Sequence, residues 1–144
     1  MNSSGTNSGG WDSCEMRNTT LPSILSQMPY DVQVGIKQVD KKTSIGDATS
    51  TIKVSPDKLF LLSEIEVFGA PANSYSGEGD WYEYYQNGTS IANTQKTRNG
   101  AASNWWTRSP TNGYYDSFIN VQTNGSARSN YAAGATGVAF AFCF

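Results

Sequence analysis

The sequence predicts a single α+β domain, with short helices in its first half and an antiparallel sheet in its second half. Residues that cap short helices recur before residue 90, whereas short apolar runs and turn residues dominate from Asn104 onward. The pair Asn124-Gly125 is the strongest hairpin signal in the chain. A chain of 144 residues buries roughly 70% of its extended surface, so a hydrophobic core can support this fold without disulfide bonds.

Two short helices are expected close to the N-terminus. Asp12, or Ser13 as an alternative, can cap the first turn of a helix that continues to Arg17. Pro22 suits the first turn of a second helix, which should end before Pro29. These two helices supply the helical part of the predicted α+β fold.

The segment from residue 32 to residue 50 is predicted to be a strand followed by a loop. Val32, Val34 and Ile36 alternate with Gln33, Gly35 and Lys37, which is typical of a strand with one buried face. The residues from Lys41 to Ser50 are mostly polar and are expected to form a loop.

A strand and a helix should then meet at Ser63. The apolar run Lys58 to Leu62 has the length of a strand. Ser63 and Glu66 have the spacing of a capping box, and Gly69 can end the helix that this box begins. Residues 70–79 have the composition of a loop.

The densest group of acidic residues contains Glu78, Asp80 and Glu83. These carboxylates could bind calcium, but they lack the spacing of a calcium-binding loop. Asp80 and Glu83 are better explained as caps of a short helix that Asn87-Gly88 would end. We therefore predict no metal and no cofactor.

The region after Asn104 is expected to supply the sheet. Trp105 and Trp106 are adjacent, so in a strand they point to opposite faces, and only one should lie fully in the core. A strand over Ser117 to Gln122 turns at Thr123-Asn124-Gly125 and returns. In the last strand one face carries Val138, Phe140 and Phe142.

The residues between these strands are suited to binding a ligand. Tyrosine offers a large contact area at low entropic cost, small polar residues adapt to the ligand, and arginine anchors it. The predicted ligand-binding residues are Asn112, Tyr114, Tyr115, Asp116, Asn120, Arg128, Ser129, Asn130 and Tyr131. Arg108 is expected instead to hold a loop through hydrogen bonds to backbone carbonyls.

Composition argues against several classes of function. A net charge of −2 without a basic stripe argues against nucleic acid as a partner, and no apolar run approaches the ~20 residues of a membrane span. The absence of histidine rules out histidine-based catalysis and metal ligation. Cys14 and Cys143 could form a bridge if the termini pair, but two buried thiols are the favoured reading. We expect no catalytic residues.

The beginning of the chain differs in composition from the rest. Residues 1–8 contain only Asn, Ser, Thr and Gly behind Met1, a composition that is typical of a disordered segment or linker. A single domain is therefore expected over residues 9–144, and the chain could be a piece of a longer protein.

Six blocks in a fixed order resemble a bacterial and phage domain family of uncharacterised function. The blocks are Gly9–Arg17, Ile36–Ser44, Lys58–Gly69, Glu78–Tyr85, Trp105–Pro110 and Gly137–Cys143. Members of that family are similar to C-type lectin-like domains, in which short helices pack on a twisted antiparallel sheet. Some are the variable proteins of diversity-generating retroelements, in which an error-prone reverse transcriptase rewrites adenines near the 3′ end of the gene.

This resemblance implies a variable region over about residues 104–144, and Thr111 to Thr136 has the residue types that adenine rewriting produces. It also implies a domain, displayed on a phage particle or bacterial cell surface, that binds a protein or glycan ligand. A structural module that assembles with other domains is the alternative, and a homo-oligomer is compatible with both. Because no partner strand is evident before Gly9, the last strand could have an open edge or pair with another chain.

Overall fold

The computed structural model describes residues 1–86 and 91–144, and the side chains of residues 91 and 92 are outside this description. The helices are α1 (Gly10–Ser13), the π-helical turn η1 (Met16–Thr20), α2 (Leu21–Ser26), α3 (Tyr30–Gly35), α4 (Glu64–Phe68), α5 (Glu83–Gln86) and α6 (Ile91–Thr94). The strands are β1 (Val39–Ser44), β2 (Ile52–Asp57), β3 (Phe60–Leu61), β4 (Lys96–Arg98), β5 (Ala101–Ser103), β6 (Trp105–Pro110), β7 (Ser117–Val121), β8 (Ala127–Tyr131) and β9 (Phe140–Ala141).

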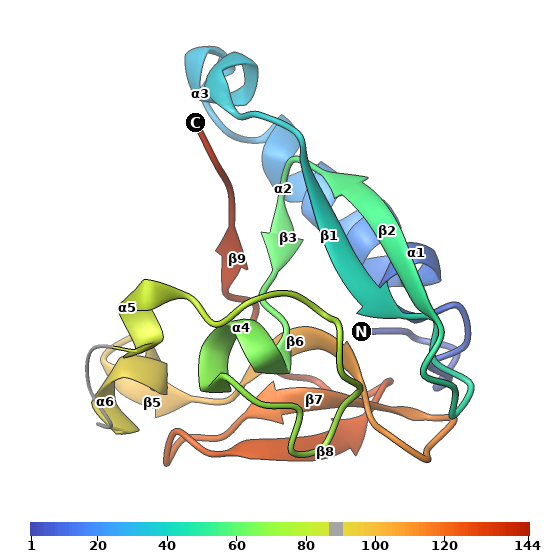
Figure 1. Cartoon of the computed structure of the whole chain (residues 1–144). Helices are drawn as coiled ribbons and strands as arrows, with labels where there is room; N and C mark the ends of the chain where they lie inside the picture. The colour runs from blue at the N-terminus through green and yellow to red at the C-terminus, as the bar shows by residue number, and fades with distance from the viewer. Residues whose placement is uncertain (87–90) are drawn as a thin grey trace.

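The described strands form small antiparallel sheets, which confirms the predicted α+β class. The largest sheet has the order β6-β7-β8, and the pairs β1-β2, β3-β9 and β4-β5 form three two-stranded sheets. Strands are thus divided among four sheets, where the sequence predicted one. In Figure 1, α4 lies in front of the β6-β7-β8 sheet, and α1 and α2 lie beside the β1-β2 hairpin.

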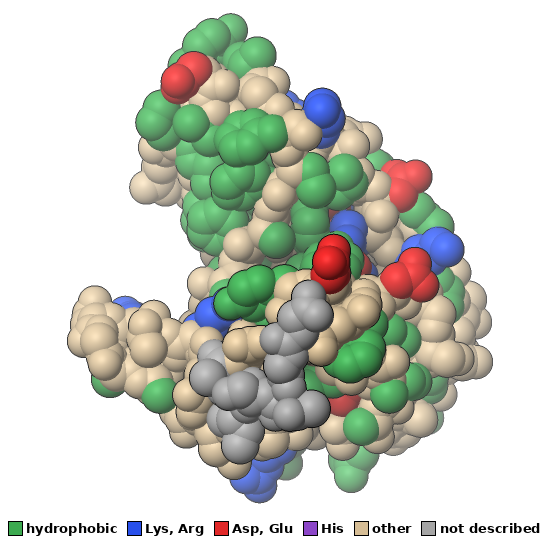
Figure 2. All heavy atoms as spheres, turned by 60° about the vertical axis from the view of Figure 1, so that its left-hand side comes forward, with side chains coloured by type: hydrophobic (Ala, Val, Ile, Leu, Met, Phe, Trp, Pro, Cys, Tyr) green, Lys and Arg blue, Asp and Glu red, His purple; other side chains and the backbone are tan. Residues whose placement is uncertain are grey.

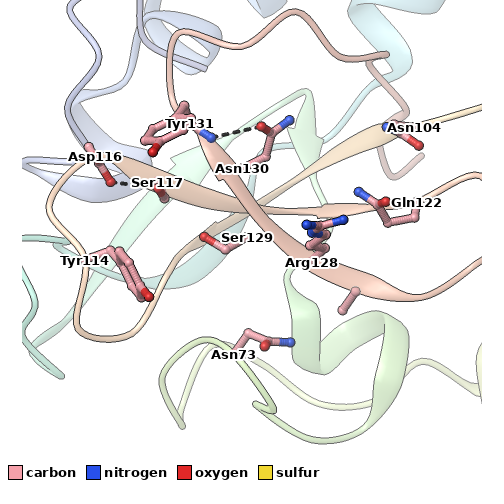
Figure 3. A pocket seen from close by; sticks show the side chains of 11 residues that line it. Asn73, Asn104, Tyr114, Asp116, Ser117, Gln122, Arg128, Ser129, Asn130 and Tyr131 are labelled. Carbon is pink, nitrogen blue, oxygen red and sulfur yellow. Dashed lines mark hydrogen bonds between the residues drawn. The ribbon is translucent and has the colours of Figure 1, made fainter.

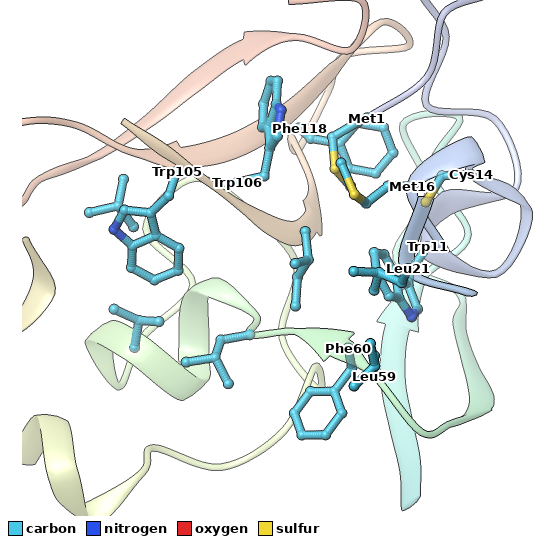
Figure 4. Close-up of a cluster of buried hydrophobic side chains, with 14 of the residues drawn as sticks. Met1, Trp11, Cys14, Met16, Leu21, Leu59, Phe60, Trp105, Trp106 and Phe118 are labelled. Atoms are coloured by element: carbon cyan, nitrogen blue, oxygen red, sulfur yellow. The ribbon is translucent and has the colours of Figure 1, made fainter. Parts of the chain in front are cut away.

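The core lies between the β6-β7-β8 sheet and the N-terminal helices, where Trp106, Phe118 and Trp11 are buried (Figure 4). Trp105 and Trp106 are only 2% and 1% exposed, so the prediction that just one of them lies fully in the core was wrong. The strand that carries them is in contact with α1, β1, β3 and α4. Because these elements cover both faces of β6, all six of its residues are buried.

The predicted start and end of α4 are confirmed. Ser63 Oγ accepts a hydrogen bond from the Glu66 backbone N–H, and the Glu66 carboxylate accepts one from the Ser63 N–H. Gly69 ends the helix at φ 79°. A Cβ atom there would lie 2.7 Å from the Trp81 ring, so both the backbone angle and the close ring favour glycine.

The strand predicted around Val32 was wrong, because Tyr30–Gly35 forms α3. Pro29 precedes this helix and Asp31 lies in its first turn, where a carboxylate interacts favourably with the helix dipole. Alternation over five residues is too short a signal to outweigh these helix-start residues. Val34 is consequently 63% exposed.

The loop predicted over Lys41 to Ser50 was also wrong in part. The β1-β2 hairpin runs through it with a continuous register from Val39↔Asp57 to Ser44↔Ile52. The sequence did not indicate this strand because its buried positions, Lys41, Thr43 and Ser44, are all polar. The intervening turn occupies only residues 45–51.

Residues 1–8 differ from the expected linker, because they pack on the domain. Met1, Asn2 and Asn7 are buried, and Asn7 Nδ2 donates hydrogen bonds to the carbonyls of Tyr114 and Ser117 at 2.8 and 2.9 Å. An asparagine side chain can satisfy buried carbonyls that no strand reaches. Composition alone therefore misjudged the segment.

Further predictions concern the cysteines, α5 and the last strand. Cys14 is buried as expected, whereas Cys143 is exposed, and both are free thiols.

Helix α5 begins at Glu83, while the predicted stop at Asn87-Gly88 lies outside the described residues. The expected last strand is β9, which pairs with β3.

No helix among the described residues has both the length and the apolar character required to cross a bilayer.

Candidate functional site

A buried arginine fixes the strands that support the site. The side chain of Arg108 is 0% exposed. Its guanidinium donates to the backbone oxygens of Lys42, Leu61 and Glu78 and to both carboxylate oxygens of Glu66, at 2.5 to 3.3 Å. The prediction that Arg108 ties chain segments together through carbonyls is confirmed, and the ion pair with Glu66 was not foreseen.

Glu66 connects the arginine to a second cation. Lys41 Nζ lies 2.6 Å from Glu66 Oε1, and the Tyr82 hydroxyl donates to the same oxygen at 3.2 Å. Burial by itself would raise the pKa of Glu66, but the hydrogen bonds and charges of Arg108 and Lys41 outweigh burial and hold this pKa below its ordinary value. We call β6, β7, α4 and this charge cluster the frame.

The frame also contains a second buried carboxylate, that of Glu78. Ser109 Oγ donates to Glu78, and the Ser44 backbone N–H donates to the other carboxylate oxygen at 2.9 Å. Burial raises the pKa of Glu78 to about 7, against the opposing effect of these hydrogen bonds. Glu78 and Ser109 are both 0% exposed, so a substrate cannot reach them and the pair holds the loop before α5.

Strand β8 and the loop before β7 are more exposed than the frame. Tyr114, Tyr115 and Tyr131 are 56%, 64% and 69% exposed, and Arg128 is also exposed. The hairpin is rigid at its base because all five residues of β7 are buried. We call the residues of 111–136 that face solvent the display surface.

A groove of about 690 Å³ lies within the display surface (Figure 3). It is lined by Asn73, Asn104, Tyr114, Asp116, Ser117, Gln122, Ala127, Arg128, Ser129, Asn130 and Tyr131. In Figure 3 the strand with Arg128 and Ser129 crosses the centre of the groove, and Asn73 faces it from a neighbouring loop. The lining is almost entirely uncharged and hydrogen-bonding.

The structure brings together most of the predicted ligand-binding residues. Those that line the groove are Tyr114, Asp116, Arg128, Ser129, Asn130 and Tyr131. Asn112 and Tyr115 are exposed beside it, whereas Asn120 is 0% exposed and cannot contact a ligand at the surface. The assignment of Asn120 to the site was wrong because Asn120 lies in β7, the middle strand of the sheet, between Trp106 of β6 and Arg128 of β8.

Several lining residues escaped the sequence analysis, and Asn73 is the clearest case. The Glu64 carboxylate accepts hydrogen bonds from the backbone N–H groups of Asn73 and Ser74 at 2.8 to 3.2 Å. The Asn73 carbonyl in turn accepts from the Asn112 N–H at 2.8 Å. The buried Glu64 thereby brings the loop 70–79 to the groove, and no local pattern signals this contact. Asn104, Ser117, Gln122 and Ala127 could have been proposed from their places at strand ends.

The chemistry of the groove favours recognition. Arg128 supplies a cation, Asp116 supplies a carboxylate that accepts a hydrogen bond from Ser117 Oγ at 2.7 Å, and Tyr114 and Tyr131 supply aromatic rings. Within residues 1–86 and 91–144, no three acidic or cysteine side chains gather as a metal site would require. The groove can hold a ligand by hydrogen bonds and aromatic contact.

Comparison with known proteins identifies the family. No curated protein and no solved structure matches the chain. The expected membership of a family of uncharacterised function is confirmed at that level. The chain belongs to the family described as domain of unknown function DUF6273, whose model matches residues 1–144.

Proposed function

We propose that this domain binds a protein or glycan ligand through the display surface and has no catalytic role. The observation that carries the proposal is the pairing of three exposed tyrosines with a polar groove on a buried frame. Exposed aromatic rings are costly on a surface without a partner, and tyrosine with arginine is typical of binding hot spots.

A more specific proposal is that the chain is a C-type lectin-like domain that serves as a variable protein of a diversity-generating retroelement. Its support is the residue composition from Thr111 to Thr136 and the division between a buried frame and an exposed display surface. Such a domain would act on a phage particle or bacterial cell surface. A reverse transcriptase gene beside a near-copy of the segment that encodes Trp105 to Phe144 would support this reading, and a neighbourhood without one would contradict it.

The binding test is a combined variant in which Tyr114, Tyr115, Arg128 and Tyr131 are replaced by alanine. Binding of the isolated domain to host-cell surfaces and to a glycan array should fall, because single hot-spot truncations each cost about 2 kcal/mol of affinity. Stability should change little, since surface substitutions usually stay within about 0.5 kcal/mol each. Tyr84→Ala is the matched control, because Tyr84 is 63% exposed and lies outside the groove. A folded variant that keeps every partner would refute the proposal.

A second candidate function is assembly with other domains or copies of this chain. An apolar patch away from the groove favours it: Tyr30, Val34, Phe142 and Phe144 are 81%, 63%, 37% and 66% exposed. Hydrophobic side chains gather on the upper part of the face shown in Figure 2. Light scattering should then show an oligomer that Tyr30→Ala and Phe144→Ala dissociate, and a monomer at all concentrations would count against this function.

A further inference from the structure

Every residue of β8 lines the groove, from Ala127 to Tyr131. Successive side chains of a strand point to opposite faces, so a groove on one face would touch only alternate residues. A groove that touches five consecutive residues is not confined to the side chains of one face. The groove therefore reaches the backbone of β8 as well as its side chains.

The edge of β8 that faces the groove has no partner strand among the described residues, because β8 is the last strand in the order β6-β7-β8. Natural proteins usually protect such edges with proline, lysine or a β-bulge. Residues 127–131 contain neither proline nor lysine, and Arg128 is their one charged residue. The β7-β8 register runs without a shift from Ser117↔Tyr131 to Val121↔Ala127.

Hydrogen bonds at both ends of the hairpin show which backbone groups face outward. The Gln122 N–H donates to the Ser126 carbonyl at 2.8 Å, and the Ala132 N–H donates to the Asp116 carbonyl at 2.7 Å. In an antiparallel pair the hydrogen-bonded positions alternate. The bonded pairs between these ends are therefore Phe118 with Asn130 and Asn120 with Arg128.

Consequently, the N–H and C=O groups of Ala127 and Ser129 point away from β7 and toward the groove. Tyr131 has the same orientation, but its N–H donates to Asn130 Oδ1 at 3.0 Å and its carbonyl accepts from the Gly134 N–H at 2.8 Å. The open part of the edge is therefore the segment from Ala127 to Ser129.

Resting on the binding function proposed above, we propose that the groove takes an extended peptide segment of a partner protein, which pairs with β8 as an added strand. An extended polypeptide presents N–H and C=O groups with the same two-residue period as Ala127 and Ser129. Sugar hydroxyls have no such period. Tyr114 and Tyr131 at one end of the groove and Gln122 at the other would select the peptide by its side chains.

The first test uses random linear peptides displayed on phage, selected against the wild-type domain and then synthesised. Each backbone amide of a selected peptide is N-methylated in turn, which leaves the protein unchanged. Strand pairing predicts a loss of about tenfold in affinity at alternate positions, because each methyl group removes one hydrogen bond and blocks the edge. Failure to select any peptide, or losses without a two-residue period, would overturn the inference.

The second test changes the protein at Ser129. Ser129→Pro removes an outward N–H and leaves the bonds to β7 in place, as edge positions allow, so peptide affinity should fall about tenfold. Ser129→Ala removes the side chain, which lines the groove, but keeps the N–H, so affinity should fall less than with Ser129→Pro. Equal losses would assign the effect to the side chain and count against strand pairing. In the free protein the amides of Ala127 and Ser129 should exchange with solvent quickly, and bound peptide should slow them.

These tests separate the inference from the function on which it rests. Suppose that glycans bind the wild type, that the combined tyrosine and arginine variant no longer binds them, and that Ser129→Pro still does. The groove then recognises sugars, and the peptide inference is wrong. If that combined variant keeps all partners, the binding function itself fails. Should Ser129→Pro not fold, the N-methylated peptides still decide the question.

Discussion

Arg108 and Arg128 show how differently the frame and the display surface use the same side chain. Arg108 is 0% exposed and donates hydrogen bonds to three backbone carbonyls and a carboxylate. Arg128 is exposed, and its side chain has no hydrogen bond or ion pair with any residue in the ranges 1–86 and 91–144. Partners from four distant segments converge on the first arginine, whereas only solvent faces the second. The frame is thus held together by buried polar groups, whereas Arg128 on the display surface makes no such contacts with the described residues.

The strongest test of this contrast is a pair of matched substitutions. Arg108→Ala should lower the free energy of unfolding by about 3 to 5 kcal/mol, because it leaves the buried Glu66 and three carbonyls without their partner. Arg128→Ala should change it by no more than about 0.5 kcal/mol. Chemical denaturation of both variants measures the difference. Equal effects would show that the frame and the display surface are not energetically distinct.

Glu78 allows the frame to be tested by pH. Its pKa rises from 4.5 to about 7 on folding, so between these values the folded state holds a proton that the unfolded state has released. The contribution of this proton to stability is complete below the pKa that Glu78 has in the unfolded state. It is lost as the pH rises through the pKa of the folded state, and the free energy of unfolding falls by about 3 kcal/mol. The lowered pKa values of Asp12 and Glu66 act with the opposite sign, and at lower pH.

Glu78→Gln keeps the side chain neutral and should therefore flatten the decline. Urea denaturation at about pH 5 and about pH 8 measures the slope in the wild type and the variant. Glu83→Gln, at an exposed position, is the control and should keep the wild-type slope. If Glu78→Gln also keeps that slope, another group titrates in this window.

The parts of the fold that could be predicted are those that depend on near neighbours. Ser63 and Glu66 are three residues apart, and the turn at Asn124-Gly125 closes its own hairpin, so a short window of sequence contains the whole signal. β1 could not be predicted, because the burial of Lys41 depends on Glu66 in another element. Polar residues inside a strand look like a loop until their partners are known.

The candidate site likewise contains residues that could be predicted from the local sequence and residues that could not. The tyrosines and Arg128 were predicted because the hairpin that carries them is local. Asn73 was missed because its loop is held by hydrogen bonds to the buried Glu64 carboxylate, which no sequence pattern indicates. Asn120 was wrongly included because residue type alone does not show that its side chain is buried in the middle strand of the sheet.

Asn7 tests whether the N-terminal segment supports the display surface. Asn7→Ala removes the donor to the Tyr114 carbonyl and one of the two donors to the Ser117 carbonyl, which keeps the Thr111 N–H at 3.0 Å. This should cost about 1 to 3 kcal/mol of stability. Ser4→Ala, at an exposed position, should cost no more than about 0.5 kcal/mol. Thermal or urea unfolding measures both variants. If Asn7→Ala is as mild as Ser4→Ala, residues 1–8 are a linker after all.

The smallest effect on stability is expected at Asn120, which lies in β7 of the frame and pairs with Arg128 of β8. Its Nδ2 has no hydrogen-bond partner among the described residues, and its Oδ1 accepts only a long bond of 3.3 Å from Gln122. Asn120→Leu branches at the same carbon and removes the unsatisfied amide, so stability should change by less than about 1 kcal/mol, with a gain favoured. Ligand affinity should stay within about twofold, because a buried side chain offers the ligand nothing. Denaturation and binding to a selected peptide measure the two quantities. A large loss of affinity in a stable variant would return Asn120 to the site.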